Sequence, residues 1–300
     1  MSIQLFFVDK MLRFTIKRRF RKHPDVMTLR AVMQDMERQV RPAPAPVAVD
    51  TADLGGVKAE RLSVPGADAG KAILYIHGGG FVAGIPANHR PLTWRLAAQV
   101  KVPVYAIDYR LAPEHKFPAG LDDCVTAYRA LLAKGIAASK IAIGGDSAGG
   151  NLTLAAALKL KQDGVALPGC LVALSPVTDL AESGPSHKEN VKSDAMFDPR
   201  TFATVPAAYC PGHDPKDPLI SPLRGDVTGL PPTLFQCSGA EMLRDDSVRM
   251  AEKMKKAGVD TTIEVWPKVF HVWQVTADML PEGRAAIAKI AAFITQRLGG

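Results

Sequence analysis

The stretch Gly145-Asp146-Ser147-Ala148-Gly149 lies between an apolar segment, residues 140–144, and a helical pattern, residues 149–163. A serine hydroxyl is a weak nucleophile and must be presented where a base can reach it. A sharp turn from a buried strand into a helix does this, and the glycines two positions before and after the serine keep side chains out of the turn. The helix N-terminus also favours the negative charge that develops on attack. The stretch therefore predicts that Ser147 is a nucleophile on a strand-to-helix turn.

Buried strands and helices alternate along most of the chain. Apolar segments predict strands at residues 71–76, 102–108, 140–144, 169–174, 233–237 and 261–266. Helical patterns occur at residues 91–100, 121–134, 149–163, 245–257 and 283–297. Strands that are mostly apolar throughout are typical of a parallel sheet covered on both faces. The sequence therefore predicts an α/β fold, with a mostly parallel central sheet and helices on both faces.

Two segments do not follow this alternation. Residues 1–40 have a helical pattern and are followed by Arg41-Pro42-Ala43-Pro44-Ala45-Pro46, which cannot continue a helix. Residues 182–213 contain prolines and aromatic residues but no buried strand, which is typical of a lid or an insertion. The expected division is a helical cap of residues 1–45 and 186–213 over a core of residues 46–185 and 214–300.

The net charge of +7 is concentrated near the N-terminus. Residues 1–41 contain ten Lys or Arg and four Asp or Glu, a net of +6, whereas the rest of the chain has 27 basic and 26 acidic residues. Residues 13–22 alternate basic and apolar side chains, as a surface helix does. We expect a solvated helix face there, with weak contact to a membrane surface as the alternative. We expect no nucleic-acid partner and, since no apolar run approaches roughly 20 residues, no transmembrane segment.

The four cysteines, Cys124, Cys170, Cys210 and Cys237, form no C-x-x-C pair and lie near no cluster of histidines. This pattern favours reduced thiols over a zinc site. The short apolar stretch at residues 3–8 has no basic residue before it and no small-residue cleavage site, so it does not fit a secretory signal. We expect a cytoplasmic protein that needs neither a metal nor an organic cofactor.

A second glycine-rich motif, His77-Gly78-Gly79-Gly80, directly follows the predicted strand at residues 71–76. Successive glycines allow backbone N–H groups to point at one spot, which is how an oxyanion hole stabilises a tetrahedral intermediate. The partner donor is expected to be the backbone N–H of the residue after the nucleophile, Ala148. The two motifs together predict acyl-transfer chemistry at Ser147.

The base must be one of seven histidines. With a nucleophile on such a turn, the chain order is Ser, then acid, then His, and only His187, His213 and His271 follow Ser147. His187 and His213 lie in the predicted insertion, where we expect exposed loop residues. His271 follows the last predicted strand, residues 261–266, and is the predicted base.

The acid that orients this histidine is expected just past the strand at residues 233–237. Glu241 fits this place best. Asp245 and Asp246 follow closely and stay open as alternatives. Both also fit the first turn of the next helix, where carboxylates are favoured in any case.

Taken together, these motifs resemble those of the hormone-sensitive-lipase-like esterases, also called bacterial lipase family IV, which have the α/β-hydrolase fold. The matching stretches are His77-Gly78-Gly79-Gly80-Phe81, Asp108-Tyr109-Arg110-Leu111-Ala112-Pro113-Glu114, Gly145-Asp146-Ser147-Ala148-Gly149-Gly150, Glu241-Met242-Leu243-Arg244-Asp245 and His271. The resemblance implies that Gly78, Gly79 and Ala148 donate to the oxyanion. It also implies a cap built from the N-terminal helices and the insertion. Two features depart from the family: most members have Asp in place of Glu241, and the usual His-Gly-Phe is here His271-Val272-Trp273.

The implied activity is hydrolysis of carboxylic esters through a Ser147–His271–Glu241 triad and an acyl-enzyme intermediate. By analogy with the family, a small cap favours short- to medium-chain acyl esters, and a homodimer is compatible with the resemblance. Amide or lactone hydrolysis on the same triad is the main alternative. A ligand-binding receptor on a degenerate scaffold is a second. The cap residues that either line the acyl pocket or pack the cap helices together are Phe6, Phe7, Met11, Met33, Met36, Met196, Phe197 and Phe202.

Overall fold

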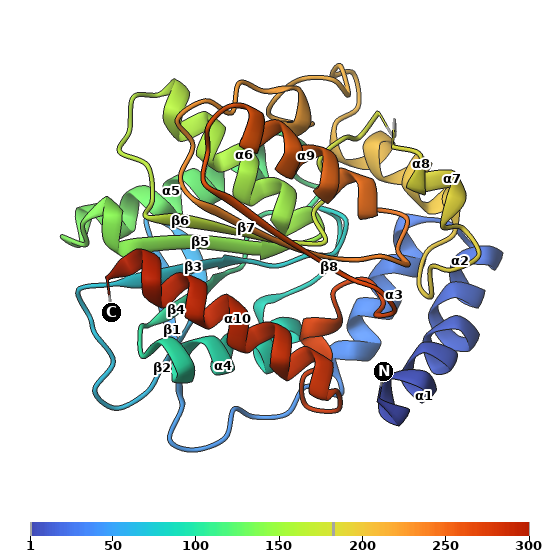
Figure 1. Ribbon diagram of the computed structural model, residues 1–300, viewed down its shortest axis with the longest axis horizontal. Coiled ribbons are helices and arrows are strands. Elements are labelled where there is room, and N and C mark those ends of the chain that lie inside the picture. Colours follow the sequence, from blue (N-terminus) through green and yellow to red (C-terminus); the bar gives the residue numbers. More distant parts are fainter. Residues whose placement is uncertain (1, 182–183, 300) are drawn as a thin grey trace.

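The computed structural model describes residues 2–181 and 184–299 (Figure 1). Residues 182–183, where the insertion was expected to begin, lie outside the described residues. Within these ranges one sheet has eight strands in the order β1-β2-β4-β3-β5-β6-β7-β8. Its parallel strands are β3 (Ala72–Ile76), β4 (Val104–Ile107), β5 (Ile141–Asp146), β6 (Cys170–Leu174), β7 (Thr233–Ser238) and β8 (Thr261–Trp266). All six strands predicted from the sequence are confirmed.

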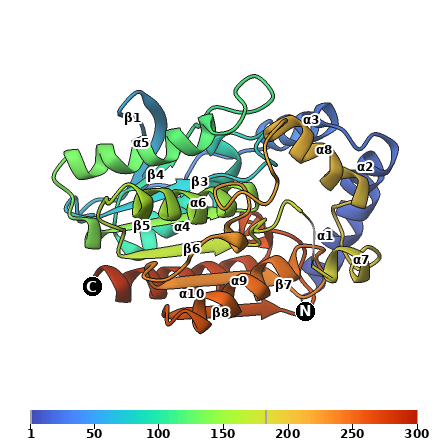
Figure 2. The same cartoon turned by 90° about the horizontal axis from the view of Figure 1, so that it is seen from above.

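Helices cover both faces of the sheet, as predicted (Figure 2). One face carries α4 (Arg90–Val100) and α10 (Pro281–Leu298), and the other carries α5 (Ala119–Ala133), α6 (Ala148–Gln162) and α9 (Arg244–Lys256). Short 3₁₀ turns lie at Pro86–His89, Ala138–Lys140, Pro222–Arg224 and Trp273–Thr276. Strands β3, β5, β6 and β7 are buried along their whole length, which explains their continuous apolar sequences.

Two antiparallel strands were not predicted. β1 (Ala48–Leu54) and β2 (Val57–Ser63) form a hairpin that joins the sheet through β2 and β4. The hairpin turn consists of Gly55 and Gly56, at φ +73° and +92°. Both values lie in the left-handed region that favours glycine.

The N-terminal segment forms a helix that continues through three regions. These are α1 (Ile3–Leu12), a π-helical turn (Arg13–Lys17) and α2 (Arg18–Lys22), and after a break α3 (Val26–Glu37) follows. Ser2 begins α1, because its hydroxyl accepts the Leu5 N–H at 3.2 Å. The Ser2 backbone N–H and hydroxyl donate to the Glu282 carboxylate on α10 at 2.6 and 2.8 Å. Pro24 separates α2 from α3, whose first turn is capped by Asp25.

The second segment outside the sheet layers contains α7 (Ser186–Glu189) and α8 (Pro199–Tyr209). These helices and α1–α3 gather beyond the carboxyl ends of the parallel strands, at the right of Figures 1 and 2, and α8 contacts α3. This position fits the predicted cap over the core, whose exact boundaries stay a prediction.

Among the described residues, no helix is both long and apolar enough to cross a membrane.

Candidate active site

Ser147 lies on the turn between β5 and α6, with φ +53° and ψ −117°. A non-glycine residue rarely adopts this conformation, and such strain persists only where the surroundings enforce it. A Cβ on Gly145 would lie 2.4 Å from the Gly149 carbonyl oxygen, and one on Gly149 would lie 2.0 Å from that of Ile76. Only glycine therefore fits on either side of the serine, because the backbones approach so closely.

His271 lies between β8 and α10, and its imidazole is buried beside Glu241. The distance from His271 Nδ1 to Glu241 Oε2 is 2.5 Å. The other carboxylate oxygen of Glu241 accepts the Ser238 N–H at 2.7 Å and the Ser175 hydroxyl at 2.9 Å. Ser175 and Ser238 were not predicted from the sequence, although Ser238 ends β7 and Ser175 directly follows β6, at the same edge of the sheet as Ser147.

The electrostatics of this pair favour a protonated imidazole. Burial lowers the pKa of His271, but the negative charge of Glu241 and its hydrogen bond outweigh that effect, with a smaller contribution from Asp194. The net result is a pKa above the ordinary value of 6.5. The charged form of His271 is thus stabilised at the position where a catalytic base holds a proton.

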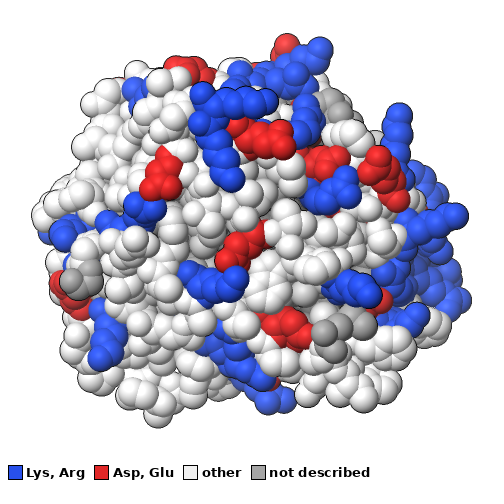
Figure 3. Space-filling model, in the orientation of Figure 1, with Lys and Arg blue, Asp and Glu red and all other residues white. Residues whose placement is uncertain are grey.

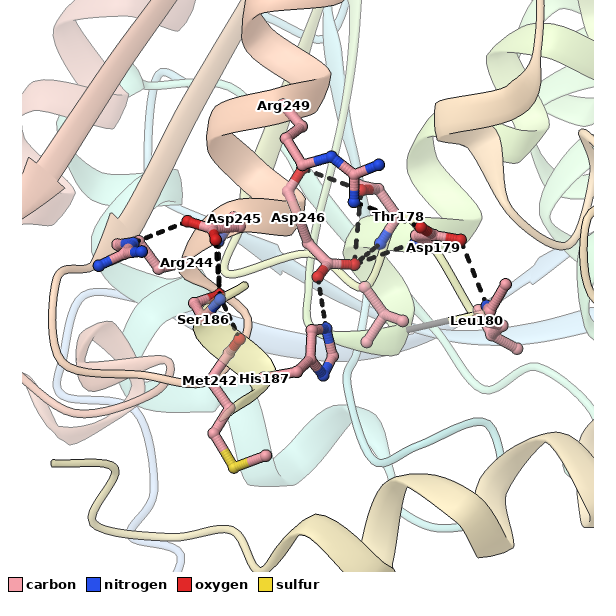
Figure 4. Close-up of polar contacts among 12 residues, drawn as sticks. Thr178, Asp179, Leu180, Ser186, His187, Met242, Arg244, Asp245, Asp246 and Arg249 are labelled. Carbon is pink, nitrogen blue, oxygen red and sulfur yellow. Dashed lines mark hydrogen bonds and ion pairs between the residues drawn. The ribbon is translucent and has the colours of Figure 1, made fainter. Parts of the chain in front are cut away.

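Asp246, in the first turn of α9, binds the segment after β6 and the helix α7 (Figure 4). Its carboxylate accepts the backbone N–H groups of Thr178 and Asp179 at 2.8 and 3.0 Å, and it pairs with His187 Nε2 at 2.9 Å. The expectation that His187 is an exposed loop residue is wrong: it is buried in α7, because the buried Asp246 carboxylate draws it inward. His213 is exposed, as expected.

Asp245 is also engaged away from His271. Its carboxylate accepts the Ser186 N–H and the Arg244 Nε–H, both at 2.8 Å, and so ties α7 to the first turn of α9 (Figure 4). Of the three acids weighed from the sequence, Glu241 is the one that the structure brings to the histidine.

The backbone around Glu241 is held by residues 190–194, which precede α8. Asn190 Nδ2 donates to the Glu241 carbonyl oxygen at 2.8 Å. The buried Asp194 carboxylate accepts the Met242 N–H at 2.9 Å, and burial raises the pKa of Asp194. This short segment therefore fixes the loop that carries the acid.

Residues 190–194 are in turn bound by cations of the N-terminal helix. Lys17 Nζ donates to the carbonyl oxygens of Val191 and Asp194 at 2.6 and 2.5 Å, and Arg13 Nη1 donates to those of Lys192 and Asp194 at 2.9 and 3.1 Å. Lys17 is buried, and burial lowers its pKa. The expectation of a solvated face over residues 13–22 is therefore wrong for Lys17, whose ammonium satisfies buried carbonyl groups.

The glycine loop after β3 lies next to the serine turn. The Gly78 N–H donates to Asp146 Oδ1 at 3.1 Å, so this N–H is already engaged. Within the described ranges, the N–H groups of Gly79 and Gly80 donate to no protein group. Ala148 is the first residue of α6, where backbone N–H groups lack a helical partner. Gly79, Gly80 and Ala148 fit an oxyanion hole better than a set that contains Gly78.

Asp146 fixes the underside of this loop. Besides Gly78, it accepts the Tyr75 hydroxyl at 2.8 Å and lies 3.1 Å from His89 Nε2. Burial raises the pKa of Asp146, but the His89 contact and the Tyr75 hydroxyl outweigh it and lower the pKa overall. Burial lowers the pKa of the adjacent His77 to about 4, so that side chain is neutral at pH 7. This role of Asp146 was not predicted from the sequence, although the residue lies inside the serine motif.

A cavity of about 950 Å³ opens over Ser147 and His271, with walls that are mostly apolar. The cap residues named from the sequence that line it are Met11, Met33, Met36, Met196, Phe197 and Phe202. Phe6 and Phe7 do not line it and are exposed instead. The Phe197 ring packs edge-on against the His271 imidazole, with 4.8 Å between the ring centroids. The N-terminal helices and the segment with α8 thus supply apolar side chains to the cavity wall near His271.

The cysteines and acidic groups show no metal site. Over residues 2–181 and 184–299, no group of three or more His, Cys, Asp or Glu side chains is arranged to hold a metal ion. The four cysteines are buried and free, as expected for reduced thiols.

Comparison with known proteins agrees with this geometry. Residues 73–275 match the family described as the alpha/beta hydrolase fold. An acetyl-hydrolase of Streptomyces hygroscopicus is 39% identical over 250 residues, 83% of this chain and 83% of that protein. An esterase of Acinetobacter venetianus is 35% identical over 291 residues, 97% of this chain and 95% of that protein.

Among solved structures, the crystal structure of an esterase from the bacterial hormone-sensitive lipase family is 39% identical to this chain. It superposes with a TM-score of 0.92, and the match covers 100% of this chain and 99% of that chain. The chain therefore belongs to the α/β-hydrolase family, among the esterases that resemble hormone-sensitive lipase.

Proposed function

We propose that this chain is a carboxylesterase that hydrolyses short- to medium-chain acyl esters through Ser147, His271 and Glu241. The observation that carries the proposal is the buried Glu241–His271 pair, which shares one apolar cavity with the strained Ser147 turn. A nucleophile, a base and an acid that orients the base are the groups that acyl transfer requires.

The reaction proceeds in two similar halves. His271 takes the proton from the Ser147 hydroxyl, whose oxygen attacks the ester carbonyl, and the tetrahedral intermediate then expels the alcohol, which His271 protonates. Water repeats the sequence on the acyl-enzyme and releases the acid. Glu241 holds the tautomer with a proton on Nδ1, so that Nε2 serves as the base.

For the oxyanion we propose Gly79, Gly80 and Ala148 as the N–H donors, in place of the set with Gly78. The N–H groups of Gly79 and Gly80 have no protein acceptor in the described chain, whereas that of Gly78 binds Asp146. Donors that are fixed before reaction stabilise the developing charge without reorganisation.

The acyl preference follows from the cavity and is supported by the relatives. A volume of about 950 Å³ is at the upper end of ordinary small-molecule sites. Such a site accommodates acyl chains of moderate length, and the name acetyl-hydrolase of the Streptomyces relative points to a short acyl group. The cap boundaries at residues 1–45 and 186–213, a cytoplasmic location and a homodimer stay predictions.

Replacing the nucleophile tests the proposal. Ser147→Ala should lower kcat for a chromogenic butyrate ester by about a millionfold, because nucleophilic attack is lost. The matched control is Ser139→Ala, at an exposed serine outside the cavity, which should keep full turnover. A fluorophosphonate probe should label the unmodified chain and the control but not Ser147→Ala.

Three results would contradict the proposal. Substantial turnover by Ser147→Ala would mean that another group is the nucleophile. Failure of the unmodified chain to react with the probe would favour a ligand-binding receptor. Faster cleavage of amides or lactones than of matched open-chain esters would move the proposal to the alternative substrate class on the same triad.

A further inference from the structure

The outer side of the N-terminal helix carries apolar side chains that no described part of the chain covers. Ile3 is 70% exposed, Phe7 is 63% and Phe14 is 69%. They recur at intervals of four and seven residues and so form one stripe along a helix of about 30 Å. Apolar residues on the other side of the helix are buried: Leu5, Val8 and Leu12. The helix is therefore apolar on both sides, and among the residues that the structure describes only one side has a partner.

Cations surround this exposed stripe. Lys10, Arg18, Arg21 and Lys22 are exposed and form no ion pair with any residue that the structure describes. The single acid on this helix, Asp9, is paired with Arg13 at 2.7 Å. Two of the cations lie over exposed rings: Lys10 Nζ is 5.6 Å from the Phe6 ring centroid, and Arg18 Cζ is 5.3 Å from that of Phe14.

We call the surface formed by Ile3, Phe6, Phe7, Lys10, Phe14, Arg18, Arg21 and Lys22 the N-terminal face. In Figure 3, Lys and Arg side chains gather along the right-hand edge, where α2 lies in Figure 1. The rest of the chain beyond residue 41 has a net charge of only +1, so the positive charge is a property of this region.

The cavity reaches the surface beside this face. Met11 lies about one helical turn from Phe7 and one from Phe14, is 48% exposed, and also lines the cavity. Met279 is likewise exposed and lines the cavity. An apolar rim therefore connects the exposed stripe with the cavity over Ser147.

From this geometry we infer that the N-terminal face docks on an anionic phospholipid surface. Exposed aromatic and aliphatic side chains flanked by Lys and Arg are the features with which a helix lies in a membrane interface. The apolar side chains enter the outer part of the lipid acyl-chain layer, while the cations bind the lipid phosphates at the level of the headgroups. A second copy of this chain fits the face poorly, because a two-fold contact would bring its unpaired cations together.

Vesicle binding tests this inference without relying on turnover. The full chain is sedimented with phosphatidylcholine vesicles that either contain or lack phosphatidylglycerol, and the bound fraction is measured. We expect binding to the anionic vesicles that weakens as salt rises. Arg18→Glu/Arg21→Glu should weaken it about tenfold or more. Phe7→Ser/Phe14→Ser should weaken it about tenfold, since the inserted apolar area is lost.

The matched control is Lys255→Glu/Lys256→Glu, which makes the same change of charge on the exposed side of α9. This control should bind like the unmodified chain, and all variants should hydrolyse a water-soluble ester at the unmodified rate, which shows that they fold. An equal loss of binding in the control, or equal binding to vesicles without phosphatidylglycerol, would overturn the inference. So would a Phe7→Ser/Phe14→Ser variant that binds vesicles normally but changes from dimer to monomer, because the face would then belong to a second copy.

Discussion

The two carboxylate oxygens of Glu241 have different partners. One accepts hydrogen bonds from the Ser238 N–H and the Ser175 hydroxyl, and the other faces His271 Nδ1. All of these partners can donate, and an ionised carboxylate is an acceptor at both oxygens. An uncharged amide of the same shape must turn its NH₂ group toward one of the donors.

We therefore expect Glu241→Gln to lower kcat about a thousandfold to ten-thousandfold, with little change in KM, because the tautomer and charge that support the base are lost. The pH profile should move as well. Activity requires neutral His271, so in the unmodified chain kcat/KM should fall as the pH drops through a value above 6.5. Removing the Glu241 charge should shift this acid limb to lower pH. Stopped-time ester assays between pH 5 and 9 measure both effects.

Asp245→Asn is the control for this prediction, since its carboxylate binds Ser186 and Arg244 rather than the base. It should keep the position of the acid limb and most of the turnover. If a folded Asp245→Asn protein lost the acid limb instead of Glu241→Gln, the acid would be misassigned.

At the residue scale, strand order and motif position identified the residues that meet in the structure. Ser147, Glu241 and His271 all follow strands that the sequence predicts, and the carboxyl ends of parallel strands share one edge of the sheet. The supporting groups were not predictable in the same way. Asp194 contacts the Met242 N–H only because two segments separated by 48 residues fold together. The sequence does not distinguish Gly78 from the two glycines that follow it, whereas in the structure the Gly78 N–H donates to Asp146.

The N-terminal helix and the residues 190–194 act as one element. Lys17 binds carbonyl groups of that segment, and the Asp194 carboxylate in turn holds the loop of Glu241. A side chain on the N-terminal helix is thereby linked through hydrogen bonds to the loop that carries Glu241. Because Lys17 binds backbone carbonyl groups, these hydrogen bonds depend on where its ammonium lies and not on the side chains of Val191 and Asp194.

Lys17→Met should lower the free energy of unfolding by about 2 kcal/mol, because buried carbonyl groups lose a charged donor while the side chain keeps its volume. Hydrogen exchange of the amides of residues 190–194 should accelerate, and kcat/KM should fall. Lys10→Met removes an exposed ammonium from the same helix and should change neither quantity. Unchanged exchange in Lys17→Met would show that the segment is held by other contacts.

The elements that the sequence missed share a physical reason. β1 is an edge strand that is largely exposed, and β2 is only partly apolar, so neither resembles a strand buried on both faces. Their hairpin does have a local signal, the Gly55-Gly56 pair between two short segments, which is typical of a two-residue turn. Over residues 13–22 the high charge predicted a fully exposed helix face, but Lys17 and Phe20 are buried.

At the scale of the whole molecule, the cavity over Ser147 lies between two parts of the chain. Strand ends of the core provide the polar groups, and helices of the N-terminal and second segments provide the apolar walls. Neither part alone surrounds the cavity. The longest acyl chain that fits it should therefore depend on the side chains that the N-terminal and second segments contribute.

We expect kcat/KM for a series of p-nitrophenyl esters to be highest for short to medium acyl chains and to decline beyond about a dozen carbons, when the chain outgrows the cavity. Phe202→Ala removes a ring from the cavity wall and should move the maximum to longer chains. Phe117→Ala, at a ring outside the cavity, should leave it in place. A rate that keeps rising with chain length in the unmodified protein would contradict a cavity that limits the length of the acyl chain.

The contact of Ser2 with Glu282 affects the order in which parts of the chain can fold during synthesis. The partner of Ser2 is synthesised 280 residues after it, and the carbonyl groups that Lys17 binds are synthesised 174 and 177 residues after it. The α1 helix is thus made long before the residues that hold it, and its inner side, with Leu5, Val8 and Leu12, stays uncovered until those residues have been made. Contacts so distant along the chain form slowly. The part of the cavity wall that Met11, Leu12 and Ile16 supply is therefore expected to take its final position only after residues 190–194 and Glu282 have been made.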